Sequence, residues 1–185
     1  MADELFKAIG FSSGVPVWRE LLGESDWELT LRELPASTRD LLHNPPLASA
    51  WISAEAAYGF SYTVARLFGP RGLHLLEEHG KICVERDIRG IYKPFLRVLT
   101  VNFAMTRAGA MYEQYSRNAG RLVPERTGDK QVVCHYVDIP RVDPVNAQFL
   151  GGPPLGILSV IGVKNARVSA RTLLARGIDI HLEWA

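Results

Sequence analysis

The stretch from residue 91 to residue 117 constrains the fold most, because it is apolar around most of a helical circumference. Its polar side chains recur at helical spacings and form one narrow stripe, made up of Lys93, Arg97, Thr100, Arg107 and Gln114. The other positions are mainly aliphatic or aromatic. An apolar surface of this width is typical of a helix that is covered by protein on most sides. The sequence therefore predicts a central helix over residues 91–117 that is surrounded by protein.

Helical segments separated by glycine and proline precede this central helix. Pro16 is a favourable first residue for a short helix that Gly23 ends. A longer helix is predicted over residues 47–68, where Gly69 and Pro70 stop it, and two shorter helices follow before residue 91. The chain is therefore predicted to be mainly helical up to the end of the central helix.

The periodicity changes from helical to alternating after the central helix. The predicted order is strand, strand, helix, strand, strand, at residues 122–127, 131–139, 146–163, 168–174 and 178–184. Pro124 indicates that the first of these strands lies at an edge, because proline cannot donate a ladder hydrogen bond. We therefore expect one α+β domain over residues 1–185. Its helical half (1–117) packs on a four-stranded antiparallel ββαββ sheet (118–185).

The charges of the chain are nearly balanced, since 21 Lys and Arg against 20 Asp and Glu give a formal net charge of +1. This balance gives no electrostatic reason to expect nucleic acid or an anionic membrane as the main partner. Charged side chains interrupt residues 91–117, so no membrane span is expected there. Asp3 and Glu4 stand where a secretion signal carries basic residues, so we expect a cytoplasmic protein.

The sequence contains no pattern that is typical of a catalytic or metal site. Cys83 and Cys134 lie far apart, and we interpret them as buried, reduced thiols. His74 and His79 are not at the i, i+4 spacing of a helical metal pair, and we interpret them as exposed or capping residues. The glycines and prolines of residues 151–156 lack the lysine and hydroxyl residue of a phosphate loop, which favours a structural role. No metal or cofactor is therefore predicted.

The end of the central helix carries Tyr112, Tyr115, Ser116 and Arg117 beside the predicted sheet. Two phenols, a hydroxyl and a guanidinium can hold a carboxylate or a phosphate, because arginine offers a planar two-donor fork. The alternative is that the tyrosines cap the core while Arg117 interacts with the negative end of the helix dipole. Both interpretations are open from the sequence.

The order of elements, and the ending HLEWA, resemble a paralogous family of unknown function expanded in myxobacteria. The pattern is also similar to a wider group that contains haem-NO-binding domains, 4-vinyl-reductase domains and the small subunits of TRAPP tethering complexes. Tyr115 and Ser116 partly resemble the Tyr-x-Ser-x-Arg stretch that haem-NO-binding domains use against haem propionates, although residues 95–107 contain no histidine. Cys83 stands near the helix that carries an acyl-modified cysteine in TRAPP subunits. The resemblance implies a binding or regulatory domain without chemistry of its own.

These observations lead us to expect a non-enzymatic sensor or scaffold domain that binds a small apolar ligand or a protein partner and forms a homodimer. We expect ligand contacts from Tyr112, Tyr115, Arg117, Cys83 and Phe103. Two alternatives stay open. One is an enzyme with an unrecognised site near Tyr115 and Arg117 that also includes His79, Cys83 and Tyr112, and the other is a purely structural oligomerisation module.

Overall fold

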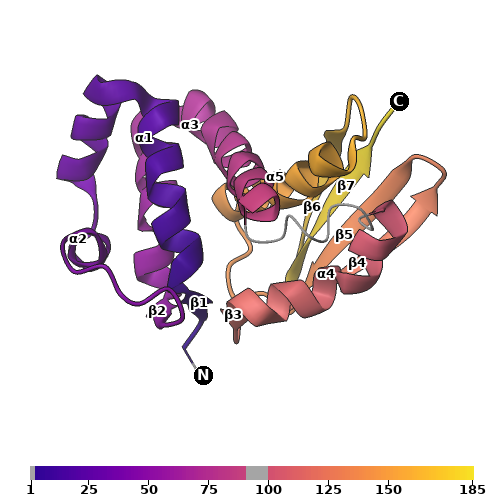
Figure 1. Cartoon of the computed structure of the whole chain (residues 1–185), viewed down its shortest axis with the longest axis horizontal. Coiled ribbons are helices and arrows are strands. Elements are labelled where there is room, and N and C mark those ends of the chain that lie inside the picture. The colour runs from indigo at the N-terminus through magenta and orange to yellow at the C-terminus, as the bar shows by residue number, and fades with distance from the viewer. Residues whose placement is uncertain (1–2, 91–99) are drawn as a thin grey trace.

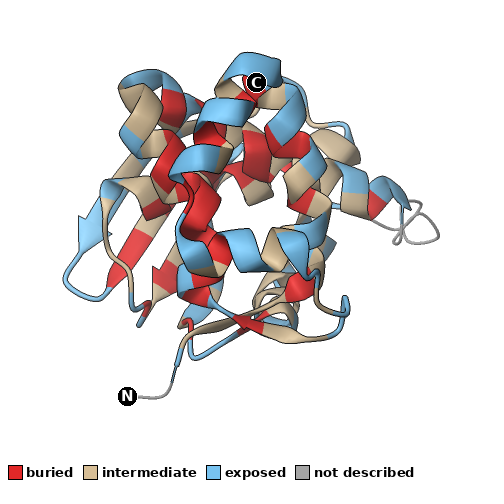
Figure 2. Cartoon of the chain, turned by 90° about the vertical axis from the view of Figure 1, so that its left-hand side faces the viewer, coloured by how far each residue is buried: buried red, intermediate tan, exposed pale blue. Residues whose placement is uncertain are grey.

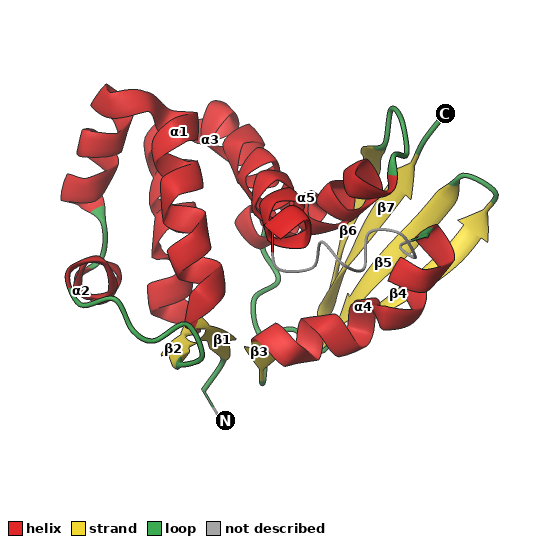
Figure 3. Ribbon diagram, in the orientation of Figure 1, coloured by secondary structure: helices red, strands yellow, loops and turns green. Residues whose placement is uncertain are grey.

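The structure is a computed structural model that describes residues 3–90 and 100–185. A helical half and a sheet half lie side by side, and two more helices lie between the sheet and the helical half (Figure 1). The colouring by secondary structure shows the same division (Figure 3). The predicted α+β class is confirmed. Residues 91–99 of the predicted central helix lie outside the described residues.

Three helices form the N-terminal half, namely α1 (Ala8–Glu33), α2 (Ala36–His43) and α3 (Ala54–Gly90). Gly23 in α1 and Gly69 in α3 have φ angles of 71° and 53°, which glycine adopts without a steric penalty. The chain continues helically beyond both glycines, so the two predicted helix ends are kinks. The last part of α3 is also one continuous helix, in place of the two shorter helices predicted there.

A small three-stranded sheet joins the start of the chain to two later segments. Its strands are β1 (Leu5–Lys7), β2 (Trp51–Ser53) and β3 (Ser116–Arg117), in the order β2-β1-β3. Phe6 pairs with Ile52 on one side and with Ser116 on the other. This pairing corrects two predicted boundaries, because residues 51–53 are extended rather than helical and the central helix ends before Ser116. Strands of two or three residues are too short to show an alternating pattern.

The described part of the predicted central helix is α4 (Val101–Tyr115). The Thr100 side chain caps it by accepting a hydrogen bond from the backbone N–H of Phe103. None of the fifteen residues of α4 is buried, so the prediction that protein surrounds this helix is wrong for this part of it. Among the described residues, no helix has the length and apolar character needed to cross a membrane.

The C-terminal sheet has the antiparallel order β4-β5-β7-β6. Its strands and the helix between them are β4 (Arg121–Gly128), β5 (Gln131–Val137), α5 (Pro144–Ile161), β6 (Arg167–Leu174) and β7 (Gly177–Glu183). The predicted ββαββ order is confirmed, and Pro124 lies on the edge strand β4 as expected. Asp143 caps the start of α5, and Pro153 and Pro154 lie inside this helix.

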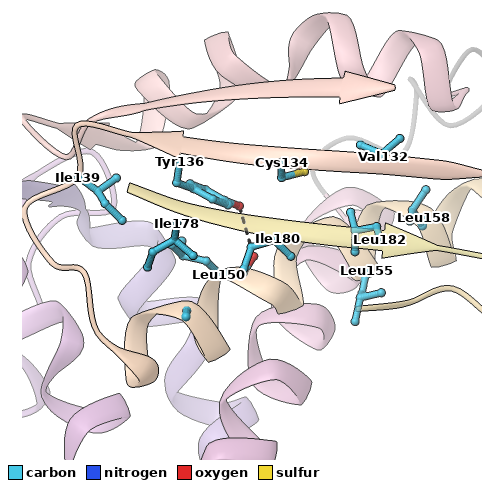
Figure 4. Packing of buried hydrophobic residues seen from close by; sticks show 11 residues of the cluster. Val132, Cys134, Tyr136, Ile139, Leu150, Leu155, Leu158, Ile178, Ile180 and Leu182 are labelled. Carbon is cyan, nitrogen blue, oxygen red and sulfur yellow. Dashed lines mark hydrogen bonds between the residues drawn. The ribbon is translucent and has the colours of Figure 1, made fainter. Parts of the chain in front are cut away.

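The core has one cluster in each half. In the sheet half, alternate residues of β5 and β7 face α5, namely Val132, Cys134, Tyr136, Ile178, Ile180 and Leu182 (Figure 4). The Tyr136 hydroxyl donates a hydrogen bond of 3.3 Å to the Leu150 carbonyl oxygen (Figure 4). In the helical half, Trp18 and Trp27 stack on Phe60, and buried positions follow one face of the helices (Figure 2). Burial of this apolar surface is the main stabilising contribution in both halves.

The two halves meet where α5 crosses α3 at backbone contact distance. A Cβ atom on Gly152 would lie 2.3 Å from the Glu77 carbonyl oxygen, and one on Gly156 would lie 2.5 Å from the Lys81 carbonyl oxygen. Only glycine fits at such distances. The glycines of residues 151–156 therefore have a packing role between two helices.

We expect Gly152→Ala to lower the free energy of unfolding by about 1–3 kcal/mol, because the methyl group forces α3 and α5 apart. Gly10→Ala is the matched control, since no atom lies within 4 Å of the added methyl group in α1. This control is expected to raise stability by about 0.5–1 kcal/mol. Urea unfolding followed by circular dichroism measures both, and equal stability of the two variants would contradict the close contact.

Candidate functional site

A cavity of about 310 Å³ lies between the helical half and the sheet half. Its walls come from β1, α1, α3, α4, α5 and the sheet, and they are mainly apolar. The aromatic wall residues are Phe6, Phe11, Trp18, Tyr58, Phe60, Tyr112, Tyr115, Tyr136 and Phe149. This volume lies at the lower end of the range for pockets that bind small molecules.

One face of α3 supplies a polar stripe to this apolar cavity. His79, Cys83 and Asp87 all line the cavity and follow each other at intervals of four residues. Residues at this spacing lie one above the other on a helix. The stripe therefore runs along the wall over two helical turns.

His79 is held rigidly in the wall. Its ring stacks on Trp18 with 4.0 Å between ring centroids, and its Nε2 atom lies 3.0 Å from the Gly14 carbonyl oxygen. A carbonyl oxygen only accepts hydrogen bonds, so Nε2 carries the proton and donates. Burial outweighs this hydrogen bond and lowers the pKa of His79 to about 4, so the ring is neutral at physiological pH. The prediction that His79 is exposed or capping is wrong, because Gly14 leaves room for the ring inside the fold.

Cys83, the next residue of the stripe, is also uncharged. Its Sγ atom lies 3.5 Å from His79 Nε2 and 3.9 Å from His79 Nδ1. Burial, with a contribution from the Asp87 carboxylate, raises the pKa of the Cys83 thiol to about 12. Burial also raises the pKa of Asp87. Cys83 is therefore a thiol rather than a reactive thiolate.

The opposite wall is the inner face of α4, which contributes Ala108, Met111, Tyr112 and Tyr115. The Tyr112 hydroxyl donates a hydrogen bond of 2.9 Å to the Ala119 carbonyl oxygen, and its ring contacts Tyr136 edge to face. Burial raises the pKa of Tyr112, so this phenol stays protonated. The four side chains of this wall are half-buried, and Tyr112 also packs against the core of the sheet half.

The structure brings together three of the five residues predicted to contact a ligand. Tyr112, Tyr115 and Cys83 all line the cavity. Arg117 lies on the outer side, with its guanidinium carbon 4.0 Å from the centroid of the Trp51 ring. Phe103 is 36% exposed on α4 and does not line the cavity. The predicted grouping of Tyr115 with Arg117 at one anion site is therefore not what the geometry favours.

Sequence reasoning missed Trp18, Tyr58 and Phe149, which belong to the cavity wall, and it placed His79 near Cys83 and Tyr112 only in the alternative of an enzyme site. They come from three different helices, and only the fold brings them together. One signal was available, because His79 and Cys83 stand four residues apart on a predicted helical stretch. Among the described residues, no group of three or more His, Cys, Asp and Glu is arranged to hold a metal ion.

The fold is similar to that of H-NOX domains. An oxygen-binding H-NOX domain related to soluble guanylate cyclases, in its oxygen complex, gives a TM-score of 0.64 with 12% identity over 96% of this chain and 94% of that chain. A variant of the T. tengcongensis H-NOX domain gives 0.59 with 12% identity over 96% and 97%. A structure concerned with H-NOX activation gives 0.56 with 11% identity over 97% and 95%.

At such low identity this likeness shows a shared fold alone, and it confirms the predicted similarity to haem-NO-binding domains at that level. No protein-family model matches the sequence, and no curated protein matches it either. The predicted resemblance to a myxobacterial family therefore gains no support.

The buried state of His79 predicts a clear contrast with His135. Burial opposes the charge on His135, but hydrogen bonds to Asp179 (2.8 Å) and Glu125 (3.1 Å) outweigh it and raise its pKa. In an NMR pH titration, His135 is expected to titrate above the usual 6.5, whereas His79 stays neutral until the pH approaches about 4. A His79 ring that titrates with the same midpoint as an exposed histidine would contradict the buried stack.

The same shifts set the direction of the pH dependence of stability. The unfolded chain binds a proton at His79 before the folded chain does, so the free energy of unfolding falls as the pH falls from about 6.5 to about 4. His135 acts in the opposite direction, since its contribution is present below pH 6.5 and is lost as the pH rises through its raised pKa. Urea unfolding at several pH values, with His135→Gln as a comparison, separates the two contributions.

Proposed function

We propose that this chain is a non-enzymatic sensor domain that binds a small apolar molecule in the cavity between α3 and α4. The observation that carries the proposal is the inner face of α4, where the half-buried side chains of Ala108, Met111 and Tyr115 line the cavity. Apolar surface that faces a cavity gains stabilisation when a ligand covers it, by about 25 cal/mol for each Å² removed from water. The H-NOX fold supports a sensor role by analogy only, because fold alone does not determine function.

The protonation states of the wall favour binding over catalysis. A general base requires a pKa near the working pH, but burial keeps the His79 ring neutral down to about 4. A nucleophilic cysteine requires a lowered pKa, but burial raises that of Cys83 to about 12. An enzyme site near Tyr115 is therefore the less favoured alternative. Homodimer formation, a protein partner and a cytoplasmic location stay predictions.

The structural likeness raises the question whether this cavity binds haem, because one of the similar structures was solved to probe haem distortion in the H-NOX family. Haem iron is held in proteins by histidine, thiolate, tyrosine, or methionine together with histidine. Among the described residues, the only histidine in the wall is His79. Its Nε2 hydrogen is donated to Gly14, and the Cys83 sulfur lies 3.5 Å from Nε2 and 3.9 Å from Nδ1. Neither nitrogen can bind iron without losing a buried contact.

Cys83 and Tyr112 fit haem no better than His79. Cys83 is a protonated thiol, and the Tyr112 hydroxyl is already bonded to the Ala119 carbonyl oxygen. Haem also carries two propionate groups, whereas Lys7 is the single basic residue in the described wall. Its ammonium group donates to the Ser49 carbonyl oxygen and lies 4.4 Å from the centroid of the Trp51 ring. The residues present therefore do not fit a haem held through its iron and propionates.

A cavity-filling substitution tests the proposal. Ala57→Phe places a large side chain at a residue of the cavity wall. It is expected to weaken binding of a small apolar probe such as octanol at least tenfold, because the ring occupies the ligand volume. Ala110→Phe is the matched control on the exposed outer face of α4 and is expected to bind like the unsubstituted chain. Isothermal calorimetry measures binding.

Haem is tested in the same series by adding it to the purified chain and recording the visible absorption spectrum. A sharp Soret band with one-to-one stoichiometry that His79→Ala removes would overturn the conclusion that haem does not fit. Equal octanol binding by the Ala57→Phe and Ala110→Phe variants would show that the ligand does not occupy this cavity.

A further inference from the structure

A second cavity of about 80 Å³ lies beneath the first half of α4, between this helix, the sheet and α5. Five residues line both cavities, namely Ala108, Leu122, Tyr136, Pro153 and Ile157. The shared residues come from α4, from strands β4 and β5, and from α5, so the two cavities are continuous or are separated only by these side chains. The space beneath α4 is therefore longer than the first cavity alone.

The inner face of α4 borders this space over its whole length. Its lining residues, Val101, Ala104, Met105, Ala108, Met111, Tyr112 and Tyr115, follow the three- and four-residue steps of one helical face. The first four border the second cavity, and the last four border the first, with Ala108 common to both. A helix of 15 residues rises by about 21 Å between its first and last residue. The lined space is thus long and narrow.

Polar groups are distributed unevenly along this space. In the described wall of the second cavity there is no charged residue, and its two polar side chains are Cys134 and Tyr136. The Tyr136 hydroxyl is bonded to the Leu150 carbonyl oxygen, so it is not available to a ligand. Hydrogen-bonding groups that face a ligand are concentrated in the first cavity, on the α3 stripe of His79, Cys83 and Asp87.

On this basis we infer that the ligand is an uncharged long-chain compound, whose hydrocarbon tail passes Ala108 into the second cavity while its polar end contacts the α3 stripe. This inference rests on the proposed function and adds the class of ligand. An uncharged end, such as an alcohol, can donate a hydrogen bond to the Asp87 carboxylate of the stripe, whereas the two His79 nitrogens are engaged at Gly14 and Cys83. A carboxylate end is disfavoured, because Asp87 carries the same charge and the ammonium group of Lys7 is engaged at Ser49 and Trp51.

A chain-length series tests the inference. Primary alcohols from octanol to hexadecanol are titrated into the protein below their aggregation limits, with the matching fatty acids as charged controls. Affinity is expected to rise by about fourfold for each added methylene that is buried and then to level off when the space is filled. Each fatty acid is expected to bind more weakly than the alcohol of the same length.

Ala104→Phe separates the second cavity from the first, because Ala104 lines only the second. This variant is expected to bind octanol normally but to lose the gain from longer chains, whereas Ala110→Phe keeps the whole series. Methyl NMR locates the tail, since long alcohols are expected to shift the resonances of Val132 and Leu182 and octanol is not.

The outcomes distinguish the two proposals. If octanol binds and Ala57→Phe prevents it, but longer chains bind no better or Ala104→Phe has no effect, the long-chain inference is overturned and the sensor proposal stands. Stronger binding of the fatty acids overturns the uncharged end. If no alcohol binds the unsubstituted chain at all, the proposal of an apolar ligand site fails with it.

Discussion

The backbone contact between α3 and α5 is the constraint on which the rest of the structure depends. Gly80, Gly152 and Gly156 remove the side chains that would separate the two helices, and α3 therefore packs directly on a helix that belongs to the sheet half. This contact sets the distance between the halves. It also fixes the orientation of α3. The helical face that carries His79, Cys83 and Asp87 therefore lines the first cavity. The cavity is a consequence of how closely two glycine-containing helices approach.

The cavity also requires that α4 does not pack against α3. Three interactions hold it against the edge strand β4 and its neighbours. A Cβ on Gly109 would lie 2.8 Å from the Leu122 carbonyl oxygen, Arg126 donates to Asn102 at 3.1 Å, and the Tyr112 hydroxyl reaches the Ala119 carbonyl oxygen. None of these interactions draws the helix toward α3. Part of the inner face of α4, at Ala108, Met111 and Tyr115, therefore lines the cavity in which we propose that a ligand binds.

The sequence predicted the parts of the fold that depend on local pattern. The hairpin of β6 and β7, the ββαββ order and the edge position of Pro124 follow from alternation and from the missing N–H of proline. It did not predict contacts made by segments far apart, such as Phe6 with Ser116, or His79 with Gly14. The apolar pattern of residues 101–115 was interpreted as a helix that protein covers on most sides, which is wrong because none of these residues is buried. Periodicity shows which residues share a helical face, but it does not show how much of that face other segments of the chain cover.

The likeness to the H-NOX fold says little about function by itself. A fold fixes where helices enclose a space, but the chemistry of the space depends on a few side chains. Here the α4 wall offers methyl, thioether and phenol groups, and the α3 wall offers a neutral imidazole whose two nitrogens are already engaged. Burial keeps the imidazole uncharged and the thiol protonated, so the imidazole offers no positive charge to an anionic group and the thiol offers no thiolate to a metal. What remains is affinity from apolar burial with hydrogen bonds at one end, and on this basis we propose a ligand that is selected by its length and by the absence of charge.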